Sequence, residues 1–325
     1  MKTYPSISIA IPTFNEEANI RRCLNSIFNQ KYPGKLEVFI VDGGSTDSTV
    51  KLAKQYPVII LSNPERHAER GKKIALDKAT SDYFMILDCD MDLVGRQWFE
   101  KMVEPLEKNS SIVGSWTKFV SLSSDKPLDR YITLDPIQRD PLFQFLTPTI
   151  NECVVAKNFQ YWIVRYKKSK ILPAGFNLFR RKQLLQTAIK NNMRFMELDN
   201  LVILLEAGYD TYAFVQGVGI HHPFLNTFDK LIRKRKRNVS TVYFNQPNKR
   251  YWTWINWNNP LHLVKLGIWV LLCYTIVPFC ITGIIKSLQY HTWLGLYELP
   301  FNVLSTNAII SSFIRQGIKI LGSLL

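Results

Sequence analysis

Apolar runs of strand length recur along the first 90 residues, and amphipathic stretches separate them. Residues 6–11 alternate small or polar side chains with isoleucine, as a half-buried strand does. Further runs at 36–41, 56–62 and 83–88 are short and mostly apolar. We therefore predict four strands in this part of the chain.

The stretches between these strands have the spacing of helices. Ile20, Leu24, Ile27 and Phe28 fall on one helical face, and residues 70–79 form another short helical pattern. Strands that alternate with helices at this pace form parallel βαβ units with right-handed crossovers. The sequence therefore predicts an α/β fold, with a mostly parallel, twisted, Rossmann-like sheet flanked by helices.

Apolar residues concentrate after position 260. Residues 261–285 contain a single charge, Lys265, near one end of the run, and about 20 apolar residues suffice to span a bilayer. Trp252, Trp254 and Trp257 precede the run, as in an interfacial aromatic belt. We predict a membrane-spanning helix here, although a long buried core helix would have the same pattern.

A second apolar stretch at about 293–314 is weaker, because it contains four polar or helix-disrupting residues: Glu298, Pro300, Asn302 and Asn307. It fits a second span, a re-entrant segment or an amphipathic helix in the interface. Basic residues flank the two stretches, so the positive-inside rule favours a hairpin with both flanks in the cytoplasm.

The chain of 325 residues has a net charge of +15, and residues 230–237 ("KLIRKRKR") are its densest basic segment. A solvated helix face is the plainer interpretation, whereas the apolar run nearby favours an anionic membrane surface. The N-terminus lacks the pattern of a secretory signal. We expect a protein of the cell membrane with a cytoplasmic globular domain at 1–228, a basic and aromatic interfacial segment at 229–259, and a membrane segment at 260–325.

Three acidic clusters follow three of the predicted strands. They are "PTFNEE" (12–17), "VDGGSTDST" (41–49) and "LDCDMD" (87–92). Open α/β sheets bind ligands in the crevice outside the carboxyl ends of their strands. Acidic residues at that edge, in a strongly basic chain, indicate a divalent cation that holds a phosphate-bearing ligand.

Asp88 and Asp90 are the candidate metal ligands. Mg²⁺ or Mn²⁺ neutralises a diphosphate through one or two carboxylates together with phosphate oxygens. An Asp-x-Asp pair alone is a weak signal, and its position about 45 residues after the second acidic cluster strengthens it. Asp92 is a possible further ligand, but a solvated loop acid is the simpler interpretation.

Other residues near these clusters are candidates for nucleotide binding. Asp42 is placed to accept hydrogen bonds from a base or ribose, and Gly43 lets the backbone approach closely. Glu16 is a similar candidate, and Arg70 and Lys72 are within reach of a phosphate. A turn for Asp42 and Gly43, and an exposed basic helix face for Arg70 and Lys72, are the plainer interpretations.

Six segments in order give the chain a family resemblance: "IPTFNEE", "VDGGSTDST", "RGKKIALDKA", "DCD", "GFNLFRR" and "MELDNLVILLEAGY". The series resembles the family 2 glycosyltransferases of GT-A fold over about residues 5–225. Within that family it is similar to membrane-attached members that build exopolysaccharides or modify lipid-linked sugars.

The resemblance implies transfer from a UDP- or GDP-linked sugar with inversion at the anomeric carbon, and a Mg²⁺ or Mn²⁺ cofactor at Asp88 and Asp90. It implies donor contacts at the acidic clusters and the helix after the third strand. The donor-binding candidates are Pro12, Thr13, Glu16, Asp42, Gly43, Arg70, Lys72 and Asp88.

The catalytic base of the family usually lies in a Glu-Asp pair, and this chain has Met196-Glu197 there. We predict Glu197 as the base, with Asp199 as the alternative. A Gln-x-x-Arg-Trp motif typical of processive synthases is not visible, which favours a non-processive enzyme. His221, His222 and Arg233 are candidates for contact with the acceptor or the diphosphate.

The expected function is transfer of a sugar to a lipid-linked glycan or lipid at the cytoplasmic membrane face. A polyprenyl-phosphate sugar synthase is an alternative on the same fold, and a non-catalytic membrane scaffold is a lesser one. Nucleic-acid binding is disfavoured because the basic cluster belongs to no recognisable recognition module.

Overall fold

The computed structural model describes residues 4–135, 137, 140–146, 149–167, 178–192, 194–223, 226–240, 251 and 258–322. Its contacts divide the chain into two compact units. Unit 1 comprises Met1–Val120 and Pro148–His222, and unit 2 comprises Ser121–Thr147 and Pro223–Leu325. The three tryptophans predicted as an aromatic belt lie outside the described residues.

Unit 1 is built on one mixed sheet, which has ten strands among the described residues. The strand order is β3-β2-β1-β4-β9-β6-β10-β8-β7, and β5 pairs with β10 beside this path. The strands are β1 (Ile7–Thr13), β2 (Leu36–Asp42), β3 (Val58–Ser62), β4 (Tyr83–Ile86), β5 (Asp92–Val94), β6 (Gly114–Val120), β7 (Val154–Lys157), β8 (Tyr161–Arg165), β9 (Leu178–Arg180) and β10 (Thr211–His221).

The four strands predicted from the apolar runs are confirmed as β1 to β4, and they pair in parallel. The prediction of a mostly parallel sheet is wrong. Strands β5, β7, β8 and β9 run antiparallel to their neighbours, and β6 and β10 form the remaining parallel pair. Most of the antiparallel strands come from residues 154–180, where the regular strand–helix alternation of the sequence has ended.

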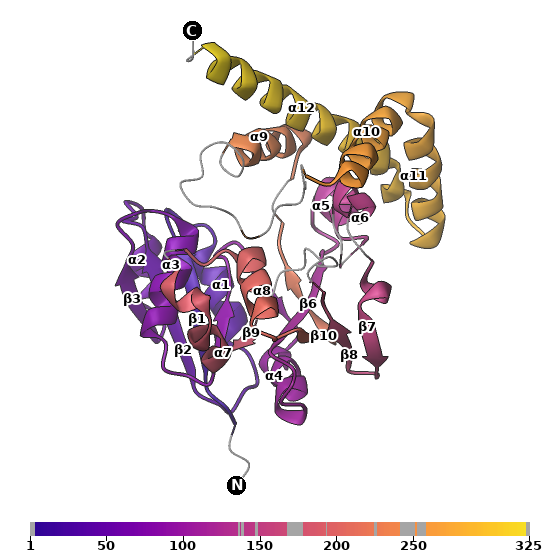
Figure 1. Cartoon of the computed structure of the whole chain (residues 1–325). Helices are drawn as coiled ribbons and strands as arrows, with labels where there is room; N and C mark the ends of the chain where they lie inside the picture. The colour runs from indigo at the N-terminus through magenta and orange to yellow at the C-terminus, as the bar shows by residue number, and fades with distance from the viewer. Residues whose placement is uncertain are drawn as a thin grey trace. The chain divides into compact units, whose positions relative to one another are not determined.

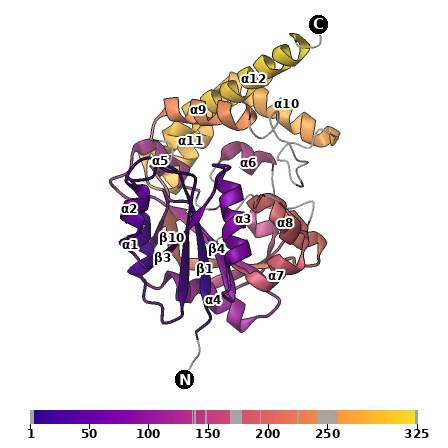
Figure 2. The same cartoon turned by 90° about the vertical axis from the view of Figure 1, so that its left-hand side faces the viewer.

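Helices flank this sheet, and Figure 2 shows α1 and α2 on one side of β1 and α3 on the other. The helices of unit 1 are α1 (Ile20–Phe28), α2 (Thr49–Ala53), α3 (Ala68–Lys78), α4 (Trp98–Lys108), α7 (Arg181–Gln186) and α8 (Glu197–Glu206), with short 3₁₀ turns η1 (Ile150–Glu152) and η2 (Ala188–Asn191).

The core of unit 1 follows the period-2 pattern of β1. Ile7, Ile9 and Ile11 share one face of the strand and are fully buried. They belong to one apolar cluster with Leu24 of α1 and Trp98 of α4. Because each buried aliphatic side chain contributes about 1.5–3 kcal/mol, this cluster holds the carboxyl ends of β1, β2 and β4 in fixed positions.

Unit 2 is helical, and Figure 1 shows its helices in magenta, orange and yellow. They are α5 (Pro127–Ile132), α6 (Pro141–Leu146), α9 (Phe228–Val239), α10 (Pro260–Thr275), α11 (Val277–Gln289), η4 (Trp293–Tyr297) and α12 (Glu298–Gly322). Helix α12 packs against α9, α10 and α11, and η4 packs against α5 and α11.

The single helix predicted at 261–285 is not formed, because the chain breaks at Ile276 between α10 and α11. Whether this segment spans a membrane stays a prediction. Within the described part of the chain, no helix alone is long and apolar enough to cross a membrane; α10 and α11 meet both conditions only as a pair bent by 85°. Pro278 explains the break, since its ring lacks an N–H and clashes with the carbonyl four residues earlier in a continuous helix. The weaker stretch at 293–314 forms η4 and most of α12.

Candidate functional site

The acidic clusters meet at the carboxyl edge of β1, β2 and β4. The register pairs Thr13 of β1 with Asp42 of β2. Ala10 of β1 pairs with Ile86 of β4, two residues before Asp88. Parallel pairing of these strands therefore brings the three clusters to one edge of the sheet, as expected for a ligand crevice.

Asp42 is engaged by its own turn. Its carboxylate accepts hydrogen bonds from the backbone N–H groups of Gly44 and Ser45, at 2.9 Å each, and from the hydroxyls of Ser45 and Thr13. Gly44 has a φ of +80°, a conformation that glycine adopts at little cost. These contacts agree with the turn interpretation of Asp42, and its contact with a nucleotide stays a prediction.

The loop after β1 is tied to the loop after β2. Thr46 N–H donates to Asn15 Oδ1 at 2.9 Å, and Asn15 N–H donates to Ser45 Oγ at 2.9 Å. Ser48 N–H donates to Glu17 Oε2 at 3.0 Å. This reciprocal bonding fixes the two acidic clusters relative to each other.

Glu16 lies between these loops and faces other carboxylates. Its backbone N–H donates to Thr49 Oγ1 at 2.7 Å, and its side chain accepts from Asn19 at 2.7 Å. Burial raises the pKa of Glu16 above its ordinary value, and the charges of Asp90 and Asp88 raise it further. Glu16 is therefore placed where a cation would be favourable.

The end of β1 is approached closely by Gly71 of α3 and by Gly43 after β2. A Cβ atom at Gly71 would lie 3.1 Å from Pro12 Cβ, and one at Gly43 would lie 3.4 Å from Thr13 O. Arg70 points its guanidinium to Glu65, with Nε 2.8 Å from Glu65 Oε1. The predicted phosphate contact of Arg70 therefore requires it to exchange or share that ion pair.

Lys72 joins two motifs that are far apart in the sequence. It is 3 % exposed, and its Nζ lies 2.6 Å from Glu197 Oε1 and 3.2 Å from Asp88 Oδ1. Burial alone disfavours the ammonium form, but Asp88 and Glu197 raise the pKa of Lys72 above its ordinary value. Lys72 is thus a buried cation between the Asp-x-Asp motif and the predicted base, and not part of an exposed basic face.

Glu197 and Asp199 differ in accessibility. Glu197 is the first residue of α8, and its side chain is 33 % exposed. Asp199 lies two residues later on the same helix and is 5 % exposed. A general base must reach the proton that it removes, so the geometry favours Glu197 over Asp199.

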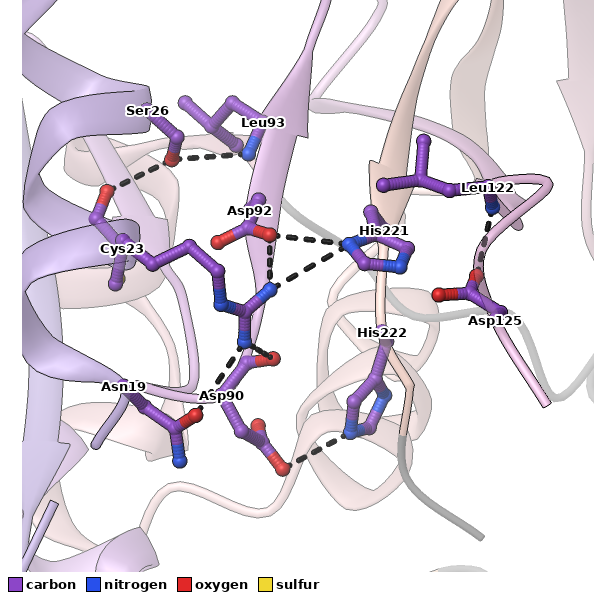
Figure 3. Close-up of polar contacts among 11 residues, drawn as sticks. Asn19, Cys23, Ser26, Asp90, Asp92, Leu93, Leu122, Asp125, His221 and His222 are labelled. Carbon is purple, nitrogen blue, oxygen red and sulfur yellow. Dashed lines mark hydrogen bonds and ion pairs between the residues drawn. The ribbon is translucent and has the colours of Figure 1, made fainter. Parts of the chain in front are cut away.

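Asp90 and Asp92 are held by two histidines and an arginine (Figure 3). His222 Nε2 lies 3.1 Å from Asp90 Oδ2, and His221 Nδ1 lies 3.0 Å from Asp92 Oδ2. The antiparallel pairing of β5 with β10 sets Asp92 opposite His221. His221 and His222 therefore both reach the third acidic cluster.

Arg22 of α1 completes this arrangement. Its guanidinium forms an ion pair with Asp92 and donates to the backbone carbonyl of Asp90 at 3.0 Å. The Asp92 side chain is 14 % exposed, so the interpretation of Asp92 as a solvated loop acid is wrong. Sequence reasoning missed Arg22, because no spacing rule connects it with an acid 70 positions later.

Asp88 and Asp90 suit a hard divalent cation. Their carboxylates are 42 % and 43 % exposed, and oxygen ligands of this kind match Mg²⁺ and Mn²⁺ when phosphate oxygens and water complete the shell. Among the described residues, no three His, Cys, Asp or Glu side chains group closely enough to hold a metal ion by themselves. Asp88 and Asp90 would therefore supply only part of the coordination shell of such a cation.

Two further features are a residue predicted from the sequence and a cavity. Arg233 belongs to α9 of unit 2, where it is largely exposed and pairs with Asp229 at 2.8 Å. A cavity of about 520 Å³ lies at the opposite edge of the sheet of unit 1, beside Tyr4, Asp82 and Arg181. It contains none of the predicted site residues, so we do not place the ligand there.

Comparison with known proteins agrees with this fold. Open α/β sheets bind ligands outside the carboxyl ends of their strands, which is the edge where these carboxylates lie. Residues 8–184, more than half of the chain, match the family model described as "Glycosyl transferase family 2". The chain therefore belongs to glycosyl transferase family 2.

Individual relatives match over shorter segments. The chain is 28 % identical over 144 residues to "Glycosyltransferase AglE" of Haloferax volcanii, a match that covers 42 % of this chain and 47 % of that protein. It is 39 % identical over 88 residues to a "Dolichyl N-acetyl-alpha-D-glucosaminyl phosphate 3-beta-D-2,3-diacetamido-2,3-dideoxy-beta-D-glucuronosyltransferase" of Methanococcus voltae, covering 25 % of this chain and 27 % of that protein. The matches thus span less than half of either relative.

A solved structure supports the fold. The mannosyltransferase PcManGT from Pyrobaculum calidifontis, determined in complex with GDP-Man and Mn²⁺, is 17 % identical and has a TM-score of 0.50. The alignment covers 95 % of this chain and 89 % of that one. The fold of unit 1 is GT-A-like, with a mixed sheet.

Proposed function

We propose that this protein is a glycosyltransferase that moves a sugar from a nucleotide-sugar donor to a lipid-linked glycan or lipid at a membrane face. The observation that carries the proposal is the position of Lys72 between Asp88 and Glu197. One buried cation thus links the motif proposed for the donor phosphates with the motif proposed for the base.

The donor diphosphate is assigned to the edge formed by Asp88 and Asp90. Mg²⁺ or Mn²⁺ held by these carboxylates would offset the negative charge that develops on the departing diphosphate. The solved mannosyltransferase of similar fold was determined with GDP-Man and Mn²⁺, which supports this assignment. Glu16, which faces Asp88 and Asp90, would gain from the same positive charge.

Glu197 is proposed to take the proton from an acceptor hydroxyl. As that oxygen attacks the anomeric carbon, the bond from this carbon to the diphosphate breaks and the electron pair leaves with the diphosphate, so the configuration inverts. A sugar hydroxyl is a poor nucleophile until its proton is removed in the transition state. The ammonium of Lys72, 2.6 Å from Glu197 Oε1, would hold this carboxylate in position.

A lipid-linked saccharide is the proposed acceptor. The Methanococcus voltae relative carries dolichyl phosphate-linked sugar in its name. A polyprenyl phosphate, the acceptor of the alternative enzyme, is already anionic and needs no base, so the position of Glu197 favours a hydroxyl. Association with the cell membrane, with the catalytic unit in the cytoplasm, is part of this proposal.

Two variants and one product analysis test the proposal. Glu197→Gln should abolish transfer from radiolabelled nucleotide sugar into a lipid extract while donor binding is kept, and Asp199→Asn should retain transfer. The product should be an extended saccharide. A mild-acid-labile monophosphodiester would instead establish the polyprenyl-phosphate enzyme, and full activity of Glu197→Gln would refute the assignment of the base.

A further inference from the structure

The helices α10 and α11 of unit 2 expose apolar side chains over most of their length. We call these residues the apolar face: Leu261, Leu263, Val264, Ile268, Leu271, Tyr274, Ile276, Val277, Ile281, Ile284, Ile285 and Leu288, each 37–70 % exposed. Lys265 is the one charged residue of the two helices that is exposed. A helix that faces water normally carries charges on its outer side, and a patch of this extent marks an interaction surface.

The inner side of the same helices combines an apolar cluster, which includes Trp269, Cys273 and Phe279, with buried polar contacts. Lys286 of α11 turns inward, where its Nζ lies 2.8 Å from both Asp135 and Glu298. Trp269 Nε1 donates to Thr306 Oγ1 at 3.0 Å. Glu298 and Thr306, both on α12, are no more than 5 % exposed. Paired charged and hydroxyl groups are thus buried inside while the exposed outer side is aliphatic, a distribution that suits a lipid-facing bundle.

Close backbone approach between two glycines of unit 2 also suits a lipid surrounding. A Cβ atom at Gly283 of α11 would lie 2.8 Å from Gly295 O of η4, so the two segments touch through their backbones. Where lipid removes the hydrophobic drive for helices to associate, small residues at the contact make van der Waals packing efficient.

The elbow between α10 and α11 is also apolar. Ile276 has a φ of 62°, which is unfavourable for a β-branched residue, and it is 50 % exposed beside Val277 at 62 %. Turns exposed to water usually consist of glycine, asparagine, aspartate or serine. An exposed Tyr274-Thr275-Ile276-Val277 elbow instead suits a non-aqueous surrounding.

The length of the two helices matches half a bilayer. At 1.5 Å per residue, the 16 residues of α10 and the 13 residues of α11 are about 24 Å and 20 Å long. With a bend of 85°, two equally inclined legs reach a depth of about 15 Å, which is half of the roughly 30 Å hydrocarbon core. Neither leg alone is long enough to cross that core, and Figure 1 shows the two legs meeting at the elbow.

The polar ends and the basic helix α9 suit a lipid surface. The legs begin and end at polar residues, Asn259 and Gln289. Helix α9, which packs against α12, has six basic residues and one acidic residue among its twelve. Such a helix favours anionic headgroups, so charge selects a phospholipid surface over a second copy of this basic chain.

We propose that α10 and α11 form a re-entrant wedge that enters one leaflet of an anionic phospholipid bilayer. Ile276 and Val277 lie deepest, and both ends of the wedge emerge on the same side. The wedge replaces the spanning helix expected from composition. It does not rest on the catalytic assignment, because every residue that carries it belongs to unit 2.

The native thiol of Cys280 reports insertion directly. It is exposed, and the other four cysteines are buried. An environment-sensitive maleimide dye on Cys280 of the full chain should shift to the blue with vesicles of equal parts phosphatidylcholine and phosphatidylglycerol, and lipids with quenchers along their acyl chains should quench it. An unchanged spectrum would overturn the proposal.

Accessibility of the two ends separates a wedge from a span. In a Cys280→Ser background, Asn258→Cys and Gln289→Cys should both react with a membrane-impermeant maleimide outside the vesicles to which the protein is bound. Protection of one end alone would establish a spanning arrangement and overturn the wedge.

A charge at the elbow provides the matched comparison. Val277→Glu should weaken vesicle binding by about tenfold or more, because a carboxylate is costly in hydrocarbon. Val155→Glu, at a position of unit 1 that is 55 % exposed, should bind as the wild type does. Equal binding of the Val277→Glu chain, or self-association of the wild type without vesicle binding, would contradict the proposal. Both variants should keep the wild-type unfolding temperature.

Discussion

Lys72 Nζ lies 2.6 Å from Glu197 Oε1, although the two residues are 125 positions apart. The contact joins α3, which follows the third parallel strand, to the first turn of α8. Lys72 also reaches Asp88, so it is common to the predicted base and the predicted metal ligands. The geometry makes this residue the centre of the site.

Lys72→Met tests that role. Removal of the ammonium leaves two carboxylates without their shared cation, which should lower the free energy of unfolding by about 1–3 kcal/mol and abolish sugar transfer. The neighbouring Lys73→Met is the matched control, because Lys73 is equally buried but pairs with Asp77 of its own helix. It should lose a similar amount of stability and keep transfer; equal loss of transfer in both variants would contradict a specific role for Lys72.

Substitution of Asp90 should affect mainly donor binding, and substitution of Asp92 should affect mainly the stability of the fold. Asp90→Asn should weaken Mn²⁺-dependent binding of the donor by more than about tenfold with little change in the unfolding temperature of the free protein. Asp92→Asn should lower that temperature, because it breaks the contacts with Arg22 and His221. Calorimetric titration and thermal unfolding measure the two effects, and the reverse pattern would exchange the assigned roles.

Glu16 should make stability depend on pH. Its pKa in the folded state is raised, so the penalty on its charge is absent below the unfolded value of about 4.3 and grows as pH rises through the folded value. Glu16→Gln should therefore stabilise the metal-free protein at pH 7 and have little effect near pH 4. A difference in unfolding temperature that is the same at both pH values would contradict this account.

Two helical glycines of unit 2 give opposite predictions. Gly283→Ala should destabilise the protein by about 1–3 kcal/mol, because the new methyl group meets the Gly295 carbonyl. Gly267→Ala on α10 has open space around the new atom and should stabilise it by up to about 1 kcal/mol. Denaturant unfolding in detergent compares them, and a stabilised Gly283→Ala chain would exclude the close packing of α11 on η4.

The strand–helix alternation of the first 90 residues was sufficient to predict β1 to β4, because parallel strands with local crossovers leave a periodic signal. Strand β9 could not be predicted in the same way. It is three residues long and is stabilised by pairing with β4 and β6, partners remote in sequence. The break at Ile276 could have been predicted from Pro278. The apolar composition of the whole run led instead to the prediction of one continuous helix.

The part of the site that could be predicted from the sequence is the set of motif residues, most of which follow predicted strands. Asp88 and Glu197 were predicted as site residues from their motifs, whereas the contact of both with Lys72 depends on how α3 and α8 pack. The cluster of Arg22, Asp92 and His221 required the structure, because it depends on the antiparallel pairing of β5 with β10. A local sequence pattern contains no information on such pairing.

Thermal stabilisation by nucleotide sugars tests the central claim most directly. A panel of UDP-, GDP- and dTDP-sugars should include a donor that raises the unfolding temperature of the wild type with Mn²⁺, and the effect should disappear with a chelator or in Asp88→Asn. Failure of every nucleotide sugar to stabilise the folded wild-type chain would contradict the assignment of the acidic strand edge as a donor site.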